Sequence, residues 1–170
     1  MNFVWEKVEK TIRWFVRLLG KVLHRDVSDE RSDILVQFVK FGLVGLSNTI
    51  ISYLINVLVL ITLSKQRITY DYVIGNIAAF VISVLWSFYW NNKYVFVMSN
   101  GEERSLLKAL LKTYVAYAFT GIVLNNLLSY AWINWFHISK YLAPIINLIV
   151  SVPLNFILNR LWAFKTEGVQ

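Results

Sequence analysis

Four long stretches of the sequence carry no charged side chain, and they dominate its pattern of apolar and polar positions. The uncharged runs cover residues 41–63, 72–92, 113–136 and 141–159. At about 1.5 Å per residue, each run is close to the length of helix that crosses roughly 30 Å of hydrocarbon. The runs lack the alternation of apolar and polar residues that barrel strands show. The pattern therefore predicts an all-α polytopic membrane protein, with transmembrane helices at about 38–63, 72–92, 113–136 and 141–162 in a domain of residues 34–165.

The first 25 residues have a different pattern. Lys and Arg lie between apolar residues that recur at helical spacing, namely Val4, Val8, Ile12, Phe15, Leu19 and Val22. This pattern is typical of an amphipathic helix in the membrane interface, here at the inner leaflet. A soluble helix packed on a partner is the alternative. Residues 26–33, DVSDERSD, resemble a polar connector, so we predict that residues 1–33 precede the transmembrane domain as a separate region.

The distribution of Lys and Arg predicts the orientation of the helices. Fourteen of these residues fall on the side that holds both termini and the 93–112 loop, and three fall on the other side. Cytoplasmic loops carry the excess of Lys and Arg, so we expect both termini in the cytoplasm. The net charge of +7 has the same explanation, and we expect no nucleic-acid partner.

The second and fourth predicted helices repeat one another. A shift of 68 positions aligns residues 77–96 with 145–164, with six identities in twenty positions, and both copies end in Asn-x-x-(Tyr/Trp)-x-Phe. The first and third helices match at a shift of 77 through Asn48/Asn125, Ser52/Ser129 and Tyr53/Tyr130. Two copies of a two-helix unit keep one orientation, so an axis along the membrane normal would relate them. Chance similarity between apolar helices is the alternative.

Polar side chains form stripes on three of the predicted helices. The stripes are Asn48, Ser52 and Asn56; Asn76, Ser83, Ser87 and Asn91; and Asn147, Ser151, Asn155 and Asn159. One interpretation is structural, because interhelical hydrogen bonds stabilise membrane bundles by roughly 0.6 to 2 kcal/mol each. The other is functional, because facing amides can donate to and accept from the hydroxyl groups of a sugar without holding charge. The two interpretations are compatible.

Groups for proton coupling or catalysis are missing from the predicted helices. They contain no Asp or Glu, so the carboxylate relay of a proton-coupled transporter is absent. The sequence has no Cys, its two His residues are isolated, and it has neither a Gly-rich phosphate loop nor a metal-ligand cluster. We therefore expect that the chain is not an enzyme and has no metal or cofactor.

Four cations lie where the predicted helices meet the cytoplasmic side, namely Lys40, Lys93, Lys112 and Arg160. One interpretation is that they anchor the helices at the lipid headgroups. The other is that Arg160 converges with Lys40 or Lys93 on a lipid phosphate, for which a guanidinium group is well suited.

Three segments within residues 34–165 together resemble the GtrA-like family of small four-helix bacterial membrane proteins. They are QFVKFGLVGLSNTIISYLINVLVL, SFYWNNKYVF and PLNFILNRLWAF. The resemblance implies a bacterial cytoplasmic membrane and transfer of a polyprenyl-phosphate-linked sugar to the outer leaflet, for glycosylation of polysaccharide or teichoic acid. Membrane glycosyltransferases would make and use that lipid. The family pattern matches at Gly45, Asn48, Asn91, Asn155, Asn159 and Arg160.

We therefore predict a flippase for a lipid such as undecaprenyl-phosphate glucose. The predicted substrate-binding residues are Lys40, Asn48, Ser87, Asn91, Lys93, Asn155, Asn159 and Arg160. Four helices can hardly enclose such a path, so we expect a homo-oligomer with a subunit interface or a lateral groove. The alternative is a non-transporting scaffold, whose basic N-terminal helix recruits a glycosyltransferase.

Overall fold

The computed structural model describes residues 3–22, 28–64, 71–99, 102–139 and 142–168, and nearly all of this part is helical. Its elements in chain order are α1 (Phe3–Val22), α2 (Asp29–Ser64), α3 (Asp71–Trp90), the π-helix η1 (Asn91–Val95), β1 (Glu102–Glu103), α4 (Leu106–Ala118), the π-helix η2 (Phe119–Leu124), α5 (Asn125–Asn134), α6 (Ala143–Leu158), the π-helix η3 (Asn159–Ala163) and β2 (Glu167–Gly168). The two strands form a short antiparallel pair. The predicted all-α class is confirmed.

Four helical stretches are long and apolar enough to cross a membrane: Asp29–Leu63, Ile74–Val95, Leu106–Asn134 and Ile145–Ala163. Large apolar side chains point outward from them, as a lipid environment requires, with Leu58 61% and Ile149 74% exposed. The polytopic membrane class is therefore confirmed as well. The third stretch starts earlier than the uncharged run at 113–136, because the hydroxyl of Ser105 caps the helix by accepting from the Lys108 N–H at 3.5 Å.

The start of α2 differs from the sequence prediction. Residues 29–33, predicted to belong to a polar connector, form the first turns of this helix. The Arg31 N–H donates to the Ser28 hydroxyl at 3.4 Å, and Asp29 and Glu30 place negative charge at the helix N-terminus, where the helix dipole favours it. The connector is therefore shorter than predicted, because polar residues in a capped first turn look like a loop in sequence.

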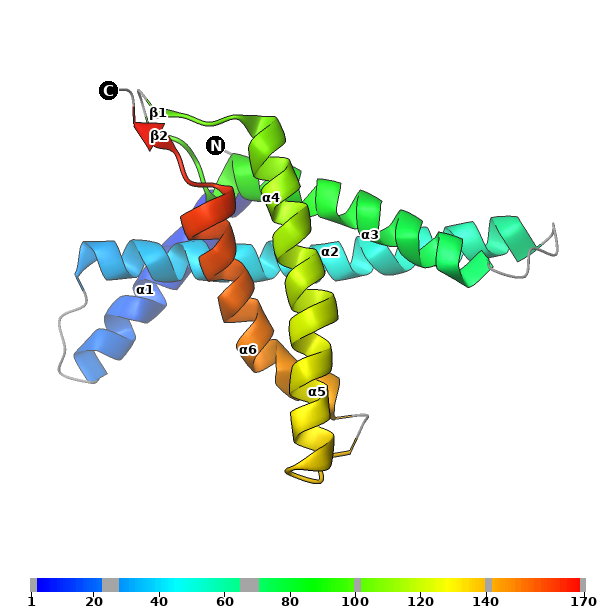
Figure 1. Ribbon diagram of the computed structural model, residues 1–170. Helices are drawn as coiled ribbons and strands as arrows, with labels where there is room; N and C mark the ends of the chain where they lie inside the picture. Colours follow the sequence, from blue (N-terminus) through cyan, green and yellow to red (C-terminus); the bar gives the residue numbers. More distant parts are fainter. Residues whose placement is uncertain (1–2, 23–27, 65–70, 100–101, 140–141, 169–170) are drawn as a thin grey trace.

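The four spans form two hairpins (Figure 1). Helices α2 and α3 run side by side as one hairpin, and α4, η2 and α5 run beside α6 as the other. The hairpins meet near the end where η1, η3, β1 and β2 lie, which we call the basic end because it also carries Lys93, Lys112 and Arg160. From there the free ends of the two hairpins point away from each other, so the hairpins are joined at one end only (Figure 1).

Phenylalanine rings join the two hairpins at the basic end. The rings of Phe96 and Phe164 stack with their centroids 4.7 Å apart. Around them, Phe88 stacks on Phe164 at 5.4 Å and Phe96 stacks on Phe156 at 5.9 Å. The shift of 68 positions converts Phe88 into Phe156 and Phe96 into Phe164, so a twofold exchange of the hairpins converts each of these two pairs into the other. This reciprocity supports the predicted repeat.

The two Asn-x-x-aromatic-x-Phe motifs fold in the same way. In each copy the last turn widens into a π-helix, in which the Phe N–H donates to the carbonyl of the Asn five residues earlier at 2.8 Å. The donors are Phe96 and Phe164, and the acceptors are Asn91 and Asn159. Both Asn side chains are fully buried. In both copies the motif thus ends in a π-helical turn, and its Phe ring packs in the junction.

Arg104 fixes this junction from the loop between the hairpins. Its guanidinium donates to the Phe164 carbonyl at 2.8 Å, the Phe96 carbonyl at 3.0 Å and the Asn92 side-chain oxygen at 2.6 Å. Its carbon lies 5.0 Å from the centre of the Phe164 ring. Burial lowers the pKa of Arg104 from its usual value, because desolvation disfavours the charged form, and the charge of Glu102 opposes this effect only in part. One side chain thus binds the last turns of both hairpins.

Replacing Phe164 by Ala should strongly destabilise the protein, because the ring is 4% exposed and contacts both hairpins. Removing a buried Phe side chain costs about 3–5 kcal/mol in folded cores. We expect a clear fall in the midpoint of thermal unfolding in detergent, followed by tryptophan fluorescence. Leu161→Ala, at a 65% exposed position of η3, the π-helix that precedes Phe164, is the control. Equal midpoints for the two variants would contradict the role of the junction.

Candidate functional site

A cavity of about 950 Å³ lies between the two hairpins, and all four spans contribute to its wall. None of its 23 lining residues is charged. Twelve of them carry an amide or a hydroxyl group: Asn48, Thr49, Ser52, Tyr53, Asn56, Asn76, Ser83, Tyr117, Thr120, Asn125, Ser151 and Asn155. The cavity therefore offers many hydrogen-bonding groups in a wall without net charge.

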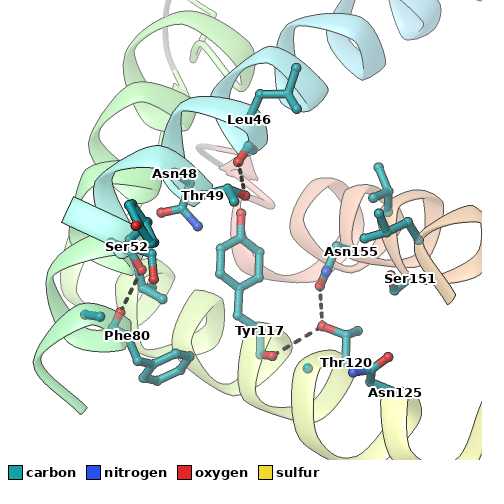
Figure 2. A pocket seen from close by; sticks show the side chains of 18 of the residues that line it. Leu46, Asn48, Thr49, Ser52, Phe80, Tyr117, Thr120, Asn125, Ser151 and Asn155 are labelled. Carbon is teal, nitrogen blue, oxygen red and sulfur yellow. Dashed lines mark hydrogen bonds between the residues drawn. The ribbon is translucent and has the colours of Figure 1, made fainter. Parts of the chain in front are cut away.

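The helical repeat explains why so many polar groups meet here. On α2, Asn48, Ser52 and Asn56 lie four residues apart, which places them on one face of the helix. Figure 2 shows Asn48 and Ser52 from α2 across from Tyr117 and Thr120, which belong to the opposite hairpin. The polar stripes predicted from the sequence thus line a common space.

The amide side chains around the cavity differ in whether their oxygen atoms accept a hydrogen bond. The side-chain oxygen of Asn155 accepts from the Thr120 hydroxyl at 2.8 Å (Figure 2). The Asn56 amide donates to the Asn76 side-chain oxygen at 2.8 Å. The side-chain oxygen of Asn48, in contrast, is buried and has no hydrogen-bond partner among the described residues. Asn48 therefore lines the cavity with a side chain whose oxygen is buried and unpaired.

Three of the five uncharged predicted site residues, namely Ser87, Asn91 and Asn159, lie outside the cavity wall, and each is fully buried. Ser87 is hydrogen-bonded to the Tyr117 hydroxyl at 2.9 Å and accepts from the Asn91 amide at 3.1 Å. The Asn159 amide donates to the Asn155 carbonyl at 2.7 Å. The Asn159 oxygen also accepts from the Thr113 hydroxyl at 3.4 Å. Ser87 and Asn159 therefore link neighbouring spans, as the structural interpretation of the stripes expects, whereas the Asn91 amide bonds within its own span. Of the predicted amides, Asn48 and Asn155 line the cavity.

The predicted cations lie in separate settings. The Lys40 ammonium forms an ion pair with Glu9 of α1 at 2.7 Å and is only 11% exposed. Lys93 is exposed and donates to the Tyr89 hydroxyl at 3.0 Å. Arg160, in η3, is half-buried and has no ion-pair partner in the described part of the chain. Arg160 and Lys93 thus have no carboxylate partner in the described part of the chain, whereas Lys40 is already paired with Glu9.

Helix α1 is attached to the transmembrane domain around Lys40. The hydrogen bond from Lys40 lowers the pKa of Glu9, and Arg13 adds to this effect. Hydrogen bonds to Glu9 at 3.0 Å and Asp33 at 2.6 Å raise the pKa of Arg13. The Trp5 ring stacks on Tyr94 with centroids 5.2 Å apart. The amphipathic segment therefore packs on its own chain, and its depth in a membrane stays a prediction.

Sequence reasoning missed the polar face of the third span. Tyr117, Thr120 and Asn125 line the cavity, although only Asn125 entered the repeat comparison. Thr113, Tyr117 and Thr120 are separated by four and then three residues, a spacing that would have placed them on one helix face. Arg104 gave no comparable signal, because its main partners are backbone carbonyls.

Comparisons with known proteins agree with the membrane fold. The family model for the transmembrane domain of GtrA/DPMS matches residues 40–164, which contain all four spans except the start of the first. The chain is similar to the uncharacterized membrane protein YwcD of Bacillus subtilis, with 31% identity over 103 residues that cover 58% of this chain and 80% of that protein. No solved structure matches the chain.

Replacing Glu9 by Gln should destabilise the protein at pH 7, because Lys40 then loses its carboxylate. The pKa of Glu9 is lowered in the folded state, so the pair's contribution is complete above the unfolded pKa of about 4.3 and is lost as the pH falls through the folded value. The difference in melting point between wild type and Glu9→Gln should therefore shrink below about pH 4.3. Glu6→Gln is the control, because its pair with Lys10 is exposed. A pH-independent difference would refute this account.

Proposed function

The chain belongs to the GtrA/DPMS transmembrane domain family, membrane proteins of glycosylation-related lipid-linked sugar handling, and on this basis we propose that it is a flippase. Its substrate would be a polyprenyl-phosphate-linked monosaccharide, for example undecaprenyl-phosphate glucose, moved from the inner to the outer leaflet. The observation that carries the proposal is the uncharged, amide-lined cavity between the hairpins. Its volume of about 950 Å³ lies in the range of small-molecule sites, roughly 300–1,000 Å³.

The cavity supplies what a sugar needs inside a membrane. A hydroxyl group that leaves water without a new hydrogen bond loses roughly 2–7 kcal/mol, depending on the reference state. Amides such as those of Asn48 and Asn155 can both donate and accept, so they can replace water around hydroxyl groups of varied orientation. The wall also adds no fixed charge that would have to be desolvated. These properties favour passage of a neutral, hydroxyl-rich headgroup.

The other two parts of the lipid would remain outside the cavity. In this proposal the phosphate contacts cations at the basic end, foremost Arg160, because a guanidinium binds phosphate oxygens through two parallel hydrogen bonds. Lys93 is exposed, and the shift of 68 converts it into position 161, which follows Arg160 in the sequence. Lys40 could take part only after its ion pair with Glu9 breaks. The polyprenyl tail stays in lipid against the exposed apolar faces of the helices.

The setting of this activity belongs to the same proposal. We place the protein in the cytoplasmic membrane of a bacterium with the basic end and both termini in the cytoplasm, on the basis of the Lys and Arg distribution. Glycosyltransferases would supply and use the lipid for polysaccharide or teichoic acid glycosylation. One chain provides the whole described cavity wall, so a homo-oligomer, which stays a prediction, is not needed to form it.

Arg160→Ala should reduce transport by about tenfold to a hundredfold, the effect of losing charged hydrogen bonds to a phosphate. The assay follows fluorescent undecaprenyl-phosphate glucose between leaflets of liposomes that contain the purified protein. Lys165→Ala removes one exposed charge from the same end and is the control. Both variants should accumulate in the membrane like wild type. Undiminished transport by Arg160→Ala would rule out its role, and a wild type without transport would rule out the flippase.

A scaffold is the second candidate, and the exposed face of α1 favours it. Phe3 is 69% and Trp14 63% exposed on this helix, a surface that a partner protein or the interface could cover. Deletion of residues 1–25 separates the two functions in liposomes without any glycosyltransferase. A flippase should retain transport, whereas a scaffold shows none there and loses glycosyltransferase binding on deletion. Glu9→Gln is a necessary control, because the deletion also removes the partner of Lys40.

A further inference from the structure

The two hairpins differ at one position where their helices pack. In the second hairpin this position is Asn147 of α6, which is 1% exposed. Its amide donates to the Asn125 carbonyl at 3.1 Å, to the Ser129 hydroxyl at 2.8 Å and to the Asn125 side-chain oxygen. Its oxygen accepts from the Trp132 indole at 3.0 Å. Every polar atom of this side chain is thus used to hold α5 against α6.

The first hairpin has residues of the same type at the positions equivalent to Asn125 and Ser129, but it has no amide at the position equivalent to Asn147. The shift of 77 converts Asn125 and Ser129 into Asn48 and Ser52, and the shift of 68 converts Asn147 into Ala79. Asn48, Ser52 and Ala79 all line the cavity. The Asn48 oxygen, whose counterpart on Asn125 accepts a hydrogen bond from Asn147, is buried without a partner among the described residues. The repeat therefore leaves the Asn48 oxygen unpaired, whereas the equivalent oxygen of Asn125 is hydrogen-bonded.

We propose that a hydroxyl group of a neutral sugar takes the place of the missing amide. When the Asn48 side chain rotates to turn its buried oxygen toward the cavity, the hydroxyl donates to that oxygen, with the Ser52 hydroxyl as its second neighbour. A buried carbonyl oxygen without a partner is unfavourable, so a ligand that supplies the missing donor gains more there than at an amide that is already satisfied. Thr120 already donates to the Asn155 oxygen on the opposite wall, so of these two cavity amides Asn48 is the one with an unpaired oxygen.

The same wall limits the class of sugar. Its described lining holds no Lys, Arg, His, Asp or Glu, so a carboxylate or an ammonium on the sugar would enter without a counter-charge. Burial of an unpaired charge is far more costly than burial of a hydroxyl that finds a partner. The site therefore takes neutral sugars and rejects uronic acids and amino sugars with a free ammonium group. This specificity rests on the proposed handling of lipid-linked sugars, but it does not require transport.

Ala79→Asn tests the inference because it introduces into the first hairpin the amide that Asn147 provides in the second. The new side chain should donate to Asn48 and Ser52, so the unliganded protein keeps or raises its melting temperature. Binding of undecaprenyl-phosphate glucose, measured by the rise in melting temperature with lipid concentration, should weaken by about tenfold or more. Ala78→Asn, the same change at a neighbouring position outside the cavity wall, should bind like wild type.

Two further variants make the result decisive if Ala79→Asn fails to fold. Asn48→Ala should weaken glucose-lipid binding by about tenfold while the melting temperature of the unliganded protein stays unchanged. Asn147→Ala should lower that temperature, because it leaves several buried groups of the second hairpin unpaired. Wild type should also bind the glucose lipid at least about tenfold better than its glucuronic acid analogue.

The outcomes separate this inference from the flippase proposal. Binding without transport by wild type would refute the flippase and leave the role of Asn48 intact. Normal binding by folded Ala79→Asn or Asn48→Ala would overturn the inference, whether or not wild type transports the lipid. Equal binding of the glucose and glucuronic acid lipids would overturn the proposed specificity.

Discussion

The stack of Phe96 on Phe164 is the contact on which the rest of the architecture depends. It joins the last turns of both hairpins, and Arg104 binds the carbonyls of the same two residues. Because this junction lies at the basic end, the hairpins can diverge toward their other ends and leave the cavity between them (Figure 1). Hairpins packed along their full length would bury the polar stripes against each other. Attachment at one end therefore leaves polar side chains of the stripes in the wall of a cavity.

Polar groups inside a membrane are stable when they find partners, and this requirement divides the amides of the chain into two classes. Asn159 and Asn147 are buried and hydrogen-bonded within or between helices, so they contribute to packing. Asn48 and Asn155 line an open volume, and one oxygen there is unpaired. Regular spacing along a helix cannot separate these classes, because both need the same face of the helix. The separation depends on how closely the neighbouring span approaches.

Hydropathy alone predicted the all-α class, because the bilayer imposes helix length and backbone pairing on any chain. The stripe on α2 also led to Asn48. What could not be predicted depends on contacts remote in sequence. The pair Lys40–Glu9 links residues 31 positions apart, and Arg104 recognises backbone oxygens that any residue would present. The π-helical turns at Asn91 and Asn159 likewise follow from packing at the junction, since sequence periodicity alone does not distinguish a widened turn from the α-helix before it.

The internal repeat provides a comparison that a single sequence seldom offers. Two copies of one hairpin face similar membrane constraints, so a polar contact that serves packing is expected in both. The contact of Asn147 with Asn125 and Ser129 occurs in one copy, and its absence from the other at Ala79 leaves an acceptor at a cavity. If packing were the only requirement at these positions, the first hairpin would gain stability from an amide at position 79. The proposed sugar site at Asn48 would account for alanine at this position, because an amide there would occupy the place of the ligand hydroxyl.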